Sequence, residues 1–423
     1  GAWAATRNFL RRSHCVLATD FAFPTIMKTF SFSRALAKAG AAFCLGTLCL
    51  GALSLSASQA KAETFVVNTV ADDVDFGDSN PGDGSCSTGR AFFEVVQDPP
   101  PSFRLVEECT LRAAIEESNA FEDENGGADT ILFQILEQSG PIVEPSSASK
   151  IKPASSHTVH RIVLDGALPD ITDSVTIDGY NRTDGNFNGT LNSAETGWNG
   201  ELAIEIDGRV VGANDFVLEV RDNRPVQGND IPNNGSVIRH LSIFGGGTVV
   251  RFFSFTEGGG SHALQGCFLG LDAAGALVSG NESTFGVRVE APNCTIGASD
   301  TENVEQRCVI SDNDDSGVSI SSDSTTVRDV YFGVNPAGTA ARGQQSTGVH
   351  VGFSFTLSDL TFSNNLIENS LFGGHDLSGI RLSPDTDITL DRTRISGNII
   401  GLNAAQSAAI PNANGIEIVA FYN

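Results

Sequence analysis

A stretch near the middle of the chain has the residue types and spacing of a calcium-binding loop. It runs from Asp184 to Glu195 as Asp-Gly-Asn-Phe-Asn-Gly-Thr-Leu-Asn-Ser-Ala-Glu. The run matches the pattern D-x-[DN]-x-[DN]-G-x5-E at every constrained position. The expected oxygen ligands come from six residues: Asp184, Asn186, Asn188, Thr190, Asn192 and Glu195. The sequence therefore predicts a calcium site, and a turn rich in asparagine and glycine is the alternative interpretation.

The predicted site would bind calcium weakly, because only Asp184 and Glu195 bring a formal charge to it. Weak affinity suits the calcium concentrations found outside cells. The residues on either side of the loop have the patterns of strands and turns. No helix–loop–helix hand is therefore expected around it.

Asp314 and Asp315 form an adjacent pair of carboxylates outside this loop. Two acidic side chains that flank a glycosidic bond are the catalytic groups of most glycoside hydrolases. The pair precedes Gly317, however, in a predicted turn where asparagine, serine or glycine would serve equally well. His375 and Asp376 occupy the corresponding turn two repeats later. The sequence has no nucleophile-elbow, metalloprotease or phosphate-loop motif, so it leaves enzymatic activity open and favours a non-enzymatic role.

The cysteines suggest disulfides and no zinc site. Three of the eight precede residue 62, and five follow it. Cys86 with Cys109 and Cys294 with Cys308 are the plausible pairs, which leaves Cys267 odd. No Cys-x-x-Cys spacing exists, so a thiolate zinc site is not expected.

The N-terminal residues have the pattern of an export signal. Met27, the only methionine, is followed by basic residues, an apolar run over 41–55 and Ala-Lys-Ala at 60–62. We therefore expect a signal peptide over 27–62 and an upstream leader without a fold over 1–26. One long, anchor-bearing N-terminus is the alternative. The apolar run is shorter than the ~20 residues that cross a bilayer, so no membrane span is expected in the mature chain.

The mature chain would be strongly acidic. Removing residues 1–62 leaves 19 basic and 50 acidic residues, a formal charge of −31. Such a chain repels nucleic acid and anionic membranes, so neither is expected as a partner. The apolar content of 40% is enough to build a core.

The C-terminal third contains a repeat that predicts the fold. Its pattern is Gly-[Val/Ile]-x-[Val/Ile/Leu], with spacings of 31, 31, 31 and 36 residues between Gly286, Gly317, Gly348, Gly379 and Gly415. Each period offers two or three short strands, and the connections are too short for helices. We therefore predict an all-β fold, a right-handed parallel β-helix in which each period is one coil. A propeller is the alternative, but its blades need about 40–45 residues.

Stacked coils would align the side chains of successive repeats. The apolar residues after each glycine are expected to point inward and form two stacks. The residues between them are expected to form one outward column: Arg288, Ser319, His350, Arg381 and Glu417. The three basic residues Arg288, His350 and Arg381 are candidates for contact with an anionic glycan, and a solvated sheet face is the alternative.

A short helix near the front of the chain is expected to cover the open end of the stack. Residues 108–120 place Leu111, Ala114 and Ile115 on one stripe at helical spacing. The polar residues Arg112, Glu116, Glu117 and Asn119 fall on the other side. A parallel stack needs such a cap because its terminal strands expose backbone groups and core side chains.

This helix carries the residues by which the chain resembles a known family. Cys109-Thr-Leu-Arg-Ala-Ala-Ile115, with Ser118-Asn-Ala120 and residues 127–133, resembles the CSLREA-motif family of exported bacterial proteins, whose motif begins Cys-Ser-Leu-Arg-Glu-Ala-Ile. Later matches follow at 168–172, 175–180, 204–208 and 395–401. The resemblance implies a pectin-lyase-like β-helix that is secreted or on the bacterial cell surface, and no single activity. Ala113 stands where the family has glutamate, so half of a capping box is missing.

These patterns divide the chain into an N-terminal cap over 63–145 and a parallel β-helix over 146–423, with a C-terminus that we expect to be truncated. The expected function is a secreted or cell-surface structural or adhesive module. It would be stabilised by calcium and would contact extracellular polysaccharide or cell-surface components. A polysaccharide lyase or glycoside hydrolase on the same scaffold is the alternative.

Overall fold

A computed structural model describes residues 62–96, 102–120, 127–135, 158–222, 233–256, 258–343, 345–352, 360–383 and 388–419. These residues lie in one compact unit of the chain, Ser58–Asn423. The expected leader over 1–26 and nearly all of the expected signal peptide over 27–62 fall outside the described residues. Within the described ranges, no helix is long and apolar enough to cross a membrane.

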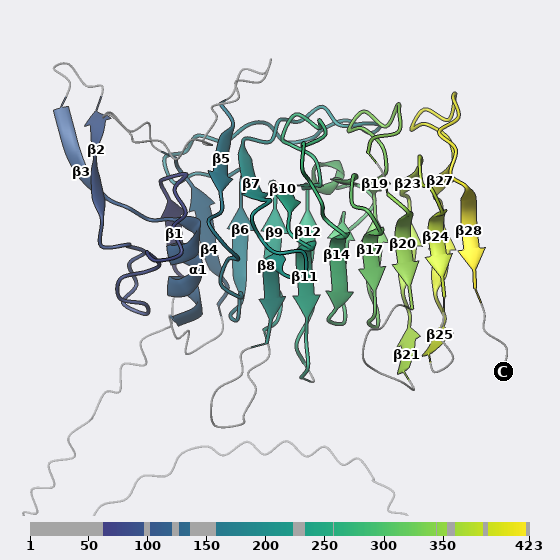
Figure 1. The fold of residues 1–423 in the computed structure, drawn as a ribbon, viewed down its shortest axis with the longest axis horizontal. Helices are drawn as coiled ribbons and strands as arrows, with labels where there is room; N and C mark the ends of the chain where they lie inside the picture. Colours follow the sequence, from purple (N-terminus) through teal and green to yellow (C-terminus); the bar gives the residue numbers. More distant parts are fainter. Residues whose placement is uncertain are drawn as a thin grey trace, which may run out of the picture. The chain divides into compact units, whose positions relative to one another are not determined.

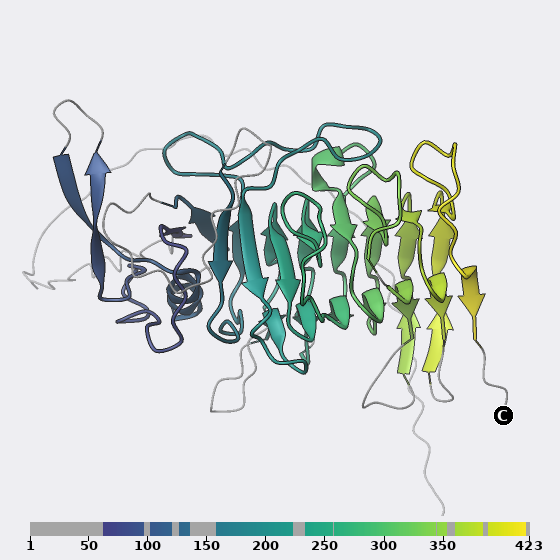
Figure 2. The same ribbon diagram turned by 45° about the horizontal axis from the view of Figure 1, so that its top comes forward.

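Three parallel sheets contain most of the strands of the described chain, which confirms the predicted right-handed parallel β-helix (Figures 1 and 2). Sheet 1 contains β1 (Thr64–Val67), β4 (Asp129–Phe133), β6 (Val175–Asp178), β9 (Val237–Arg239), β12 (Ala263–Gln265), β15 (Thr295–Gly297), β18 (Thr326–Arg328), β22 (Leu366–Glu368) and β26 (Arg394–Ser396). Sheet 2 contains β5 (His160–Val163), β7 (Ile204–Gly208), β10 (Ser242–Gly245), β13 (Phe268–Leu269), β16 (Cys308–Ile310), β19 (Val330–Phe332), β23 (Leu371–Phe372) and β27 (Ile399–Ile400). Sheet 3 contains β8 (Phe216–Arg221), β11 (Thr248–Phe253), β14 (Phe285–Glu290), β17 (Ser316–Ile320), β20 (Thr347–Val351), β24 (Ser378–Leu382) and β28 (Asn414–Ile418).

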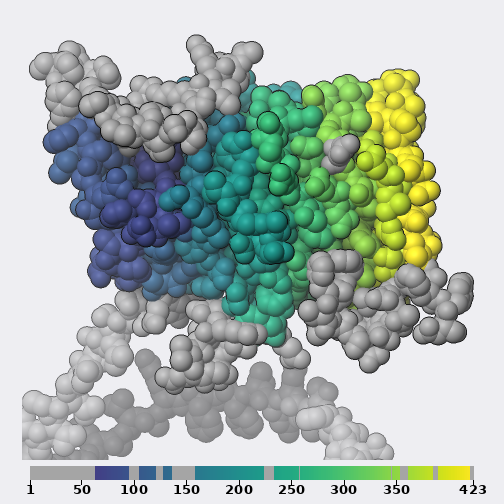
Figure 3. Space-filling view, in the orientation of Figure 1, coloured from purple at the N-terminus to yellow at the C-terminus, as the bar shows by residue number. Residues whose placement is uncertain are grey.

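The chain visits the three sheets in turn, so one strand from each makes a coil. Coil 1 is the first coil that has a strand in all three sheets, and it consists of β6, β7 and β8. The last, coil 7, consists of β26, β27 and β28. Figure 3 shows the coils as adjacent bands of colour in chain order. The remaining elements are β2 (Ala91–Val96), β3 (Ser102–Glu107), α1 (Leu111–Ala120), the 3-10 turn η1 (Val304–Gln306), β21 (Leu360–Ser363) and β25 (Ile388–Asp391).

The predicted inward stacks are present in sheet 3. Val287 pairs in register with Val318 and then Val349, and these side chains are fully buried. A second stack lies beside the first and consists of Val289, Ile320 and their counterparts in the later strands of sheet 3. Alternation places these residues in the core because successive side chains of a strand point to opposite faces.

The repeat glycine is required by a close approach between sheets 3 and 2. A Cβ added at Gly317 would lie 2.7 Å from the Phe332 ring and 2.8 Å from the Gly348 carbonyl oxygen. At Gly348 a Cβ would likewise lie 2.6 Å from the ring of Phe372. The glycine thus marks the place where the corner of each coil packs against a large side chain of sheet 2.

The helix α1 covers the first strands, as predicted, through Leu111, Ala114 and Ile115, which are buried against β1 and β4. Thr110 caps its first turn by accepting a hydrogen bond from the Ala113 amide at 3.1 Å. The strands β1 and β4 are themselves the first two strands of sheet 1, so the stack begins inside the expected cap region.

On the polar side of α1, Arg112 and Glu117 are both buried. The Arg112 guanidinium donates to both carboxylate oxygens of Asp72, at 2.9 and 2.8 Å. Glu117 accepts hydrogen bonds from the amides of Gly82 and Gly84. The acidic loop over 72–86 therefore folds onto the polar side of the helix, which a helical periodicity alone does not reveal.

The predicted disulfide between Cys86 and Cys109 is present and ties this loop to the start of α1. The predicted bond between Cys294 and Cys308 is wrong, because both are free thiols at different corners of one coil. Cys308 stacks instead on Cys267 of the preceding coil, as the adjoining pair Phe268 and Val309 shows. Burial raises the pKa of Cys294 and of Cys308 to about 12, so both thiols stay protonated.

Gly317→Ala tests the close approach at the repeat glycine. The new methyl group would overlap Phe332 and the Gly348 carbonyl, and such overpacking costs about 1–3 kcal/mol. We expect a lower Tm in thermal unfolding. Gly415→Ala is the matched control, since its Cβ would make only an ordinary 3.5 Å contact with Ile400. Equal Tm changes in the two variants would contradict the explanation.

Candidate functional site

The loop that contains the predicted calcium ligands forms a long hairpin, which we call the strap. It comprises residues 179–203, between β6 and β7. Thr190 and Glu201 pair as an antiparallel bridge, so the chain runs out along one side and returns along the other. Gly189 has a φ of +79°, and a Cβ there would lie 1.9 Å from the Glu201 carbonyl oxygen, so only glycine fits this position.

The strap crosses the outside of sheet 2 and reaches several later coils (Figure 2). The Trp198 ring packs edge-on against Phe268 of coil 3, with ring centres 4.9 Å apart. The Asn192 side chain donates to the Val304 carbonyl of coil 4 at 2.7 Å. The Gly197 amide donates to the Tyr331 hydroxyl of coil 5 at 2.9 Å. The strap therefore links coil 1 to coil 5.

Arg307 fastens the tip of the strap. Its guanidinium donates to the carbonyl oxygens of Ala194 at 3.0 Å and Glu195 at 2.9 Å, and also to that of Gly197. The same group lies over the Tyr331 ring, 4.8 Å from its centre. One buried side chain thus satisfies three backbone acceptors of a loop that comes from more than a hundred residues earlier in the sequence.

The Arg307 guanidinium also pairs with Asp329, with 2.8 Å between Nε and Oδ1. Burial raises the pKa of Asp329 despite this cation. A buried pair of this kind costs desolvation, and its value lies in the geometry that it fixes. Arg307 is therefore a structural residue, and its role could not be found from any motif.

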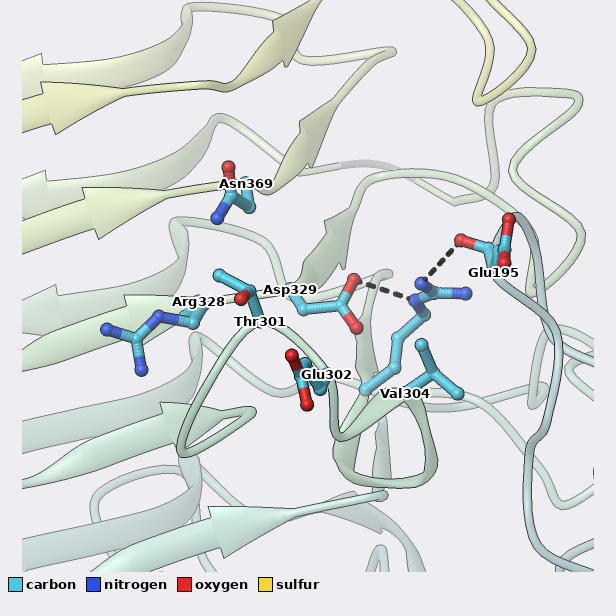
Figure 4. A pocket seen from close by; sticks show the side chains of 8 residues that line it. Glu195, Thr301, Glu302, Val304, Arg328, Asp329 and Asn369 are labelled. Carbon is cyan, nitrogen blue, oxygen red and sulfur yellow. Dashed lines mark hydrogen bonds and ion pairs between the residues drawn. The ribbon is translucent and has the colours of Figure 1, made fainter.

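A hollow of about 660 Å³ opens beside the strap tip. Figure 4 shows Glu195 on one side of it and Asp329, Glu302 and Thr301 on the other. The other lining residues are Val304, Arg307, Arg328 and Asn369. Both arginines are paired with carboxylates, Arg307 with Asp329 and Arg328 with Glu368 at 2.7 Å. The charged groups of the hollow thus mostly hold the coils together.

The predicted calcium ligands lie along the strap, and the ligand oxygens of Asp184, Thr190 and Asn192 have protein partners. Asp184 forms a two-contact ion pair with Arg182, at 2.7 and 3.1 Å, which holds its pKa below the usual range. The Thr190 carbonyl accepts from the Glu201 amide at 2.8 Å. The Asn192 side-chain oxygen accepts from the amides of Ala194 and Asn199.

The ends of the predicted ligand set contact different parts of the stack. The Asn188 side chain is buried and donates to the Phe133 carbonyl next to the cap, at 2.7 Å. Glu195 lies at the other end, on the hollow, and Asn186 lies in the turn beside Asp184, to whose carboxylate its amide donates. In the described part of the chain, no group of three or more histidine, cysteine or acidic side chains is placed to hold a metal ion.

The predicted outward column is present on the outer face of sheet 3. Arg288, Ser319, His350, Arg381 and Glu417 pair in register through five successive strands. The same column continues back to Arg251 and Glu219 in β11 and β8. The glycine repeat does not predict these two positions, because their strands lack the glycine. The alternation in Val250-Arg-Phe252 and Leu218-Glu-Val220 was the signal that could have found them.

The cations of this column are neutralised. Arg251 pairs with Glu219 at 3.0 Å and with Glu290 at 2.6 Å, and Arg288 also pairs with Glu290. Arg381 pairs with Glu417 at 3.5 Å. Burial, with a contribution from the charge of Arg381, lowers the pKa of His350 to about 4, so this histidine is neutral at pH 7.

Aromatic rings flank the first part of the column. The Arg251 guanidinium lies 4.7 Å from the ring centre of Phe216 and 4.3 Å from that of Phe253. Arg288 lies over Phe285 at 5.7 Å. We call the group formed by these residues and their acids the sheet 3 patch: Phe216, Glu219, Arg251, Phe253, Phe285, Arg288 and Glu290. Rings beside hydrogen-bonding charged groups are the combination that lines small-molecule sites.

One carboxylate of the patch has a shifted pKa. Burial raises the pKa of Glu219, against the opposing effect of the Arg251 charge, and Asp170 adds to the rise. Glu290, the other glutamate that pairs with Arg251, has a side chain that is 19% exposed. The two acids thus differ in environment while they share one arginine.

Asp314 and Asp315 lie in the turn before β17, as the repeat predicts. Their amides donate to the Ser283 and Thr284 carbonyls of the preceding coil, at 2.8 and 2.9 Å. Burial raises the pKa of Asp315. The backbone of Asp314 and Asp315 therefore joins one coil to the next. In the equivalent turn of coil 6, His375 is buried.

No family model matches the chain, and no curated protein matches it. The resemblance to the CSLREA-motif family therefore rests on the motif residues alone. What the chain itself shows is a nearly all-β protein built as a right-handed parallel β-helix with one short helix.

Arg307→Met tests how the strap is fastened. The substitution keeps the volume but removes the hydrogen bonds to the strap tip and leaves the partly buried Asp329 without its cation. We expect chymotrypsin to cleave after Trp198 at least tenfold faster, because the tip opens more often. Arg392→Met is the control, since Arg392 is 68% exposed in its ion pair with Asp391. Equal cleavage rates in the two variants would show that Arg307 does not hold the strap.

Proposed function

We propose that this chain is an exported structural or adhesive module that contacts polysaccharide through the sheet 3 patch. The single observation that carries the proposal concerns Arg251 of this patch. Its guanidinium contacts the rings of Phe216 and Phe253, and it pairs with the carboxylates of Glu219 and Glu290. Sugar rings offer apolar C–H faces to aromatic side chains and hydroxyl groups to charged ones, so this combination fits a saccharide. Export to the surface of a bacterium is supported by the CSLREA-like motif and the signal-like residues 27–62.

The charge of the patch bears on the kind of polysaccharide. Its two arginines, Arg251 and Arg288, are matched by two glutamates, Glu219 and Glu290. The chain as a whole has a formal charge of −25. An uncharged polysaccharide therefore meets less repulsion here than the anionic glycan suggested by the basic residues of the column.

Phe253→Ala tests the proposed contact. We expect the wild-type chain to bind at least one immobilised polysaccharide from a set of uncharged and anionic ones, and the variant to bind it at least tenfold more weakly because one stacking ring is lost. Phe93→Ala is the matched control, because Phe93 is 59% exposed on β2 and lies outside the patch. Binding that survives Phe253→Ala, or that falls equally with Phe93→Ala, would contradict the proposal.

A carbohydrate-active enzyme is the second candidate, favoured by the raised pKa of Glu219 beside Glu290. Two carboxyl groups in different environments, one of them with a raised pKa, are the arrangement that glycoside hydrolases use. Release of reducing sugars from a bound polysaccharide, abolished by Glu219→Gln with binding retained, would establish the enzyme. Binding without any release would leave the adhesive module.

We also propose that calcium stabilises the strap through the motif residues 184–195. Binding would require the Asp184 carboxylate to exchange its partner Arg182 for the ion. With about 10 mM calcium and a Kd of about 1 mM, the folded state gains roughly 1.4 kcal/mol, which raises the Tm. We expect a higher Tm with calcium than with a chelator, and no such rise in Glu195→Gln. Glu302→Gln, on the same hollow, is the control that keeps the rise. An unchanged Tm in the wild-type chain would rule out this role.

A further inference from the structure

The corner between sheet 2 and sheet 3 buries a polar side chain in each of three successive coils. These are Asn313 in coil 4, Gln345 in coil 5 and His375 in coil 6, and none is more than 2% exposed. Asn313 and Gln345 occupy equivalent places, because each amide leans on the repeat glycine of the preceding coil. A Cβ at Gly286 would lie 3.1 Å from the Asn313 nitrogen, and one at Gly317 would lie 2.7 Å from the Gln345 nitrogen.

The hydrogen bonds of these side chains are incomplete in one respect. The Asn313 amide nitrogen donates to the Ser311 carbonyl at 3.2 Å, and that of Gln345 donates to the Thr347 carbonyl at 3.3 Å. The amide oxygens, Oδ1 of Asn313 and Oε1 of Gln345, have no partner among the described residues. Turning either amide round would set its oxygen against a carbonyl, so a different amide orientation does not remove the deficit.

In the next coil, His375 is a further buried side chain whose polar atoms lack hydrogen-bond partners. Neither of its ring nitrogens makes a hydrogen bond of normal geometry within the described part of the chain, and the nearby Gln345 backbone offsets only part of the effect that burial has on its pKa. Burial lowers the pKa of His375 to about 4, so the ring is neutral at pH 7 and offers one N–H donor and one acceptor. The Asp376 amide donates to the Gln345 carbonyl at 3.2 Å, so the two levels are directly stacked.

The spacing of the coils matches the reach of one water molecule. Neighbouring parallel strands lie about 4.8 Å apart, so the two orphaned amide oxygens are on levels with that separation. A water that donates two hydrogen bonds of about 2.8 Å at its tetrahedral angle joins acceptors that lie about 4.6 Å apart. Buried waters are held by two to four polar partners of this kind.

We propose that this corner is an internal hydration site, in which one water bridges Asn313 Oδ1 and Gln345 Oε1 and a second water bonds the His375 ring. Water supplies the donors that both amide oxygens lack and also serves either nitrogen of the imidazole. A hard cation is a poorer fit, because the orphaned groups are two neutral amide oxygens and an imidazole, whereas such ions take six or more oxygen ligands. The buried polar groups of the corner are thus completed by solvent.

A crystal structure of the whole chain at about 1.5 Å or better tests the proposal directly. We expect a density peak between 2.6 and 3.2 Å from both amide oxygens, the usual range of hydrogen bonds to water, and another peak at the His375 ring. Density at 2.3–2.6 Å from several oxygens would identify a cation and overturn the proposal. A corner with no peak would overturn it as well.

Oxygen-17 relaxation dispersion of the solvent provides an independent test in solution, since it counts waters that stay inside a protein for longer than it tumbles. Gln345→Met keeps the side-chain length and removes one acceptor, so we expect the count to fall by at least one. Gln265→Met, on the outer face of sheet 1, is the matched control and should leave the count unchanged. An unchanged count in Gln345→Met would overturn the proposal, and the crystal structure of the wild-type chain decides the matter if this variant does not fold.

Discussion

Parallel pairing in register is the constraint on which the rest of this structure depends. Each coil lies about 4.8 Å above the last, so every side chain faces its counterpart one coil away. Apolar residues benefit from this arrangement, as the stack through Val287, Val318 and Val349 shows. Charged residues do not, because like charges at this distance repel.

The outer face of sheet 3 shows how the chain meets that constraint. Arg251 and Arg288 are direct neighbours, and Glu290 contacts both of them. His350 stands beside Arg381 and stays uncharged because burial lowers its pKa. Every non-histidine basic residue in the described ranges is arginine. Its planar group can contact a carboxylate and a ring at once, which a lysine ammonium does less well. The same chemistry serves stability and, in our proposal, the recognition of a saccharide.

The periodic part of the molecule could be predicted from the sequence, and the parts that depart from periodicity could not. Spacing alone gave the coils, the inward stacks and the outward column, because a repeat of about 31 residues has few ways to bury its apolar positions. The second disulfide failed because closeness in sequence says little about which corner of a coil a cysteine occupies. Cys294 and Cys308 are 14 residues apart, one just before β15 of sheet 1 and the other at the start of β16 of sheet 2, whereas Cys267 and Cys308 are in neighbouring coils.

The long-range contacts of the connecting loops could not be predicted from the sequence either. Nothing local indicates that Arg307 meets the carbonyls of Ala194 and Glu195, or that Arg112 and Glu117 are covered by the loop over 72–86. The loop motif at 184–195 predicts ligands of one ion, but it does not predict the contacts that these residues make along the stack. A sequence motif fixes only the types of residue in a loop. The path of the loop depends on the surface that it crosses, which the motif does not describe.

The strap has a consequence for how this protein can change in length. Solenoids usually gain or lose whole repeats without harm, because each repeat touches only its neighbours. Here the strap leaves coil 1 and ends at Arg307 and Tyr331, in coils 4 and 5. Inserting or deleting one coil between these points would shift both anchors by about 4.8 Å relative to the strap tip. The strap therefore acts as a ruler that fixes the number of coils beneath it and confines growth of the stack to the coils beyond its tip.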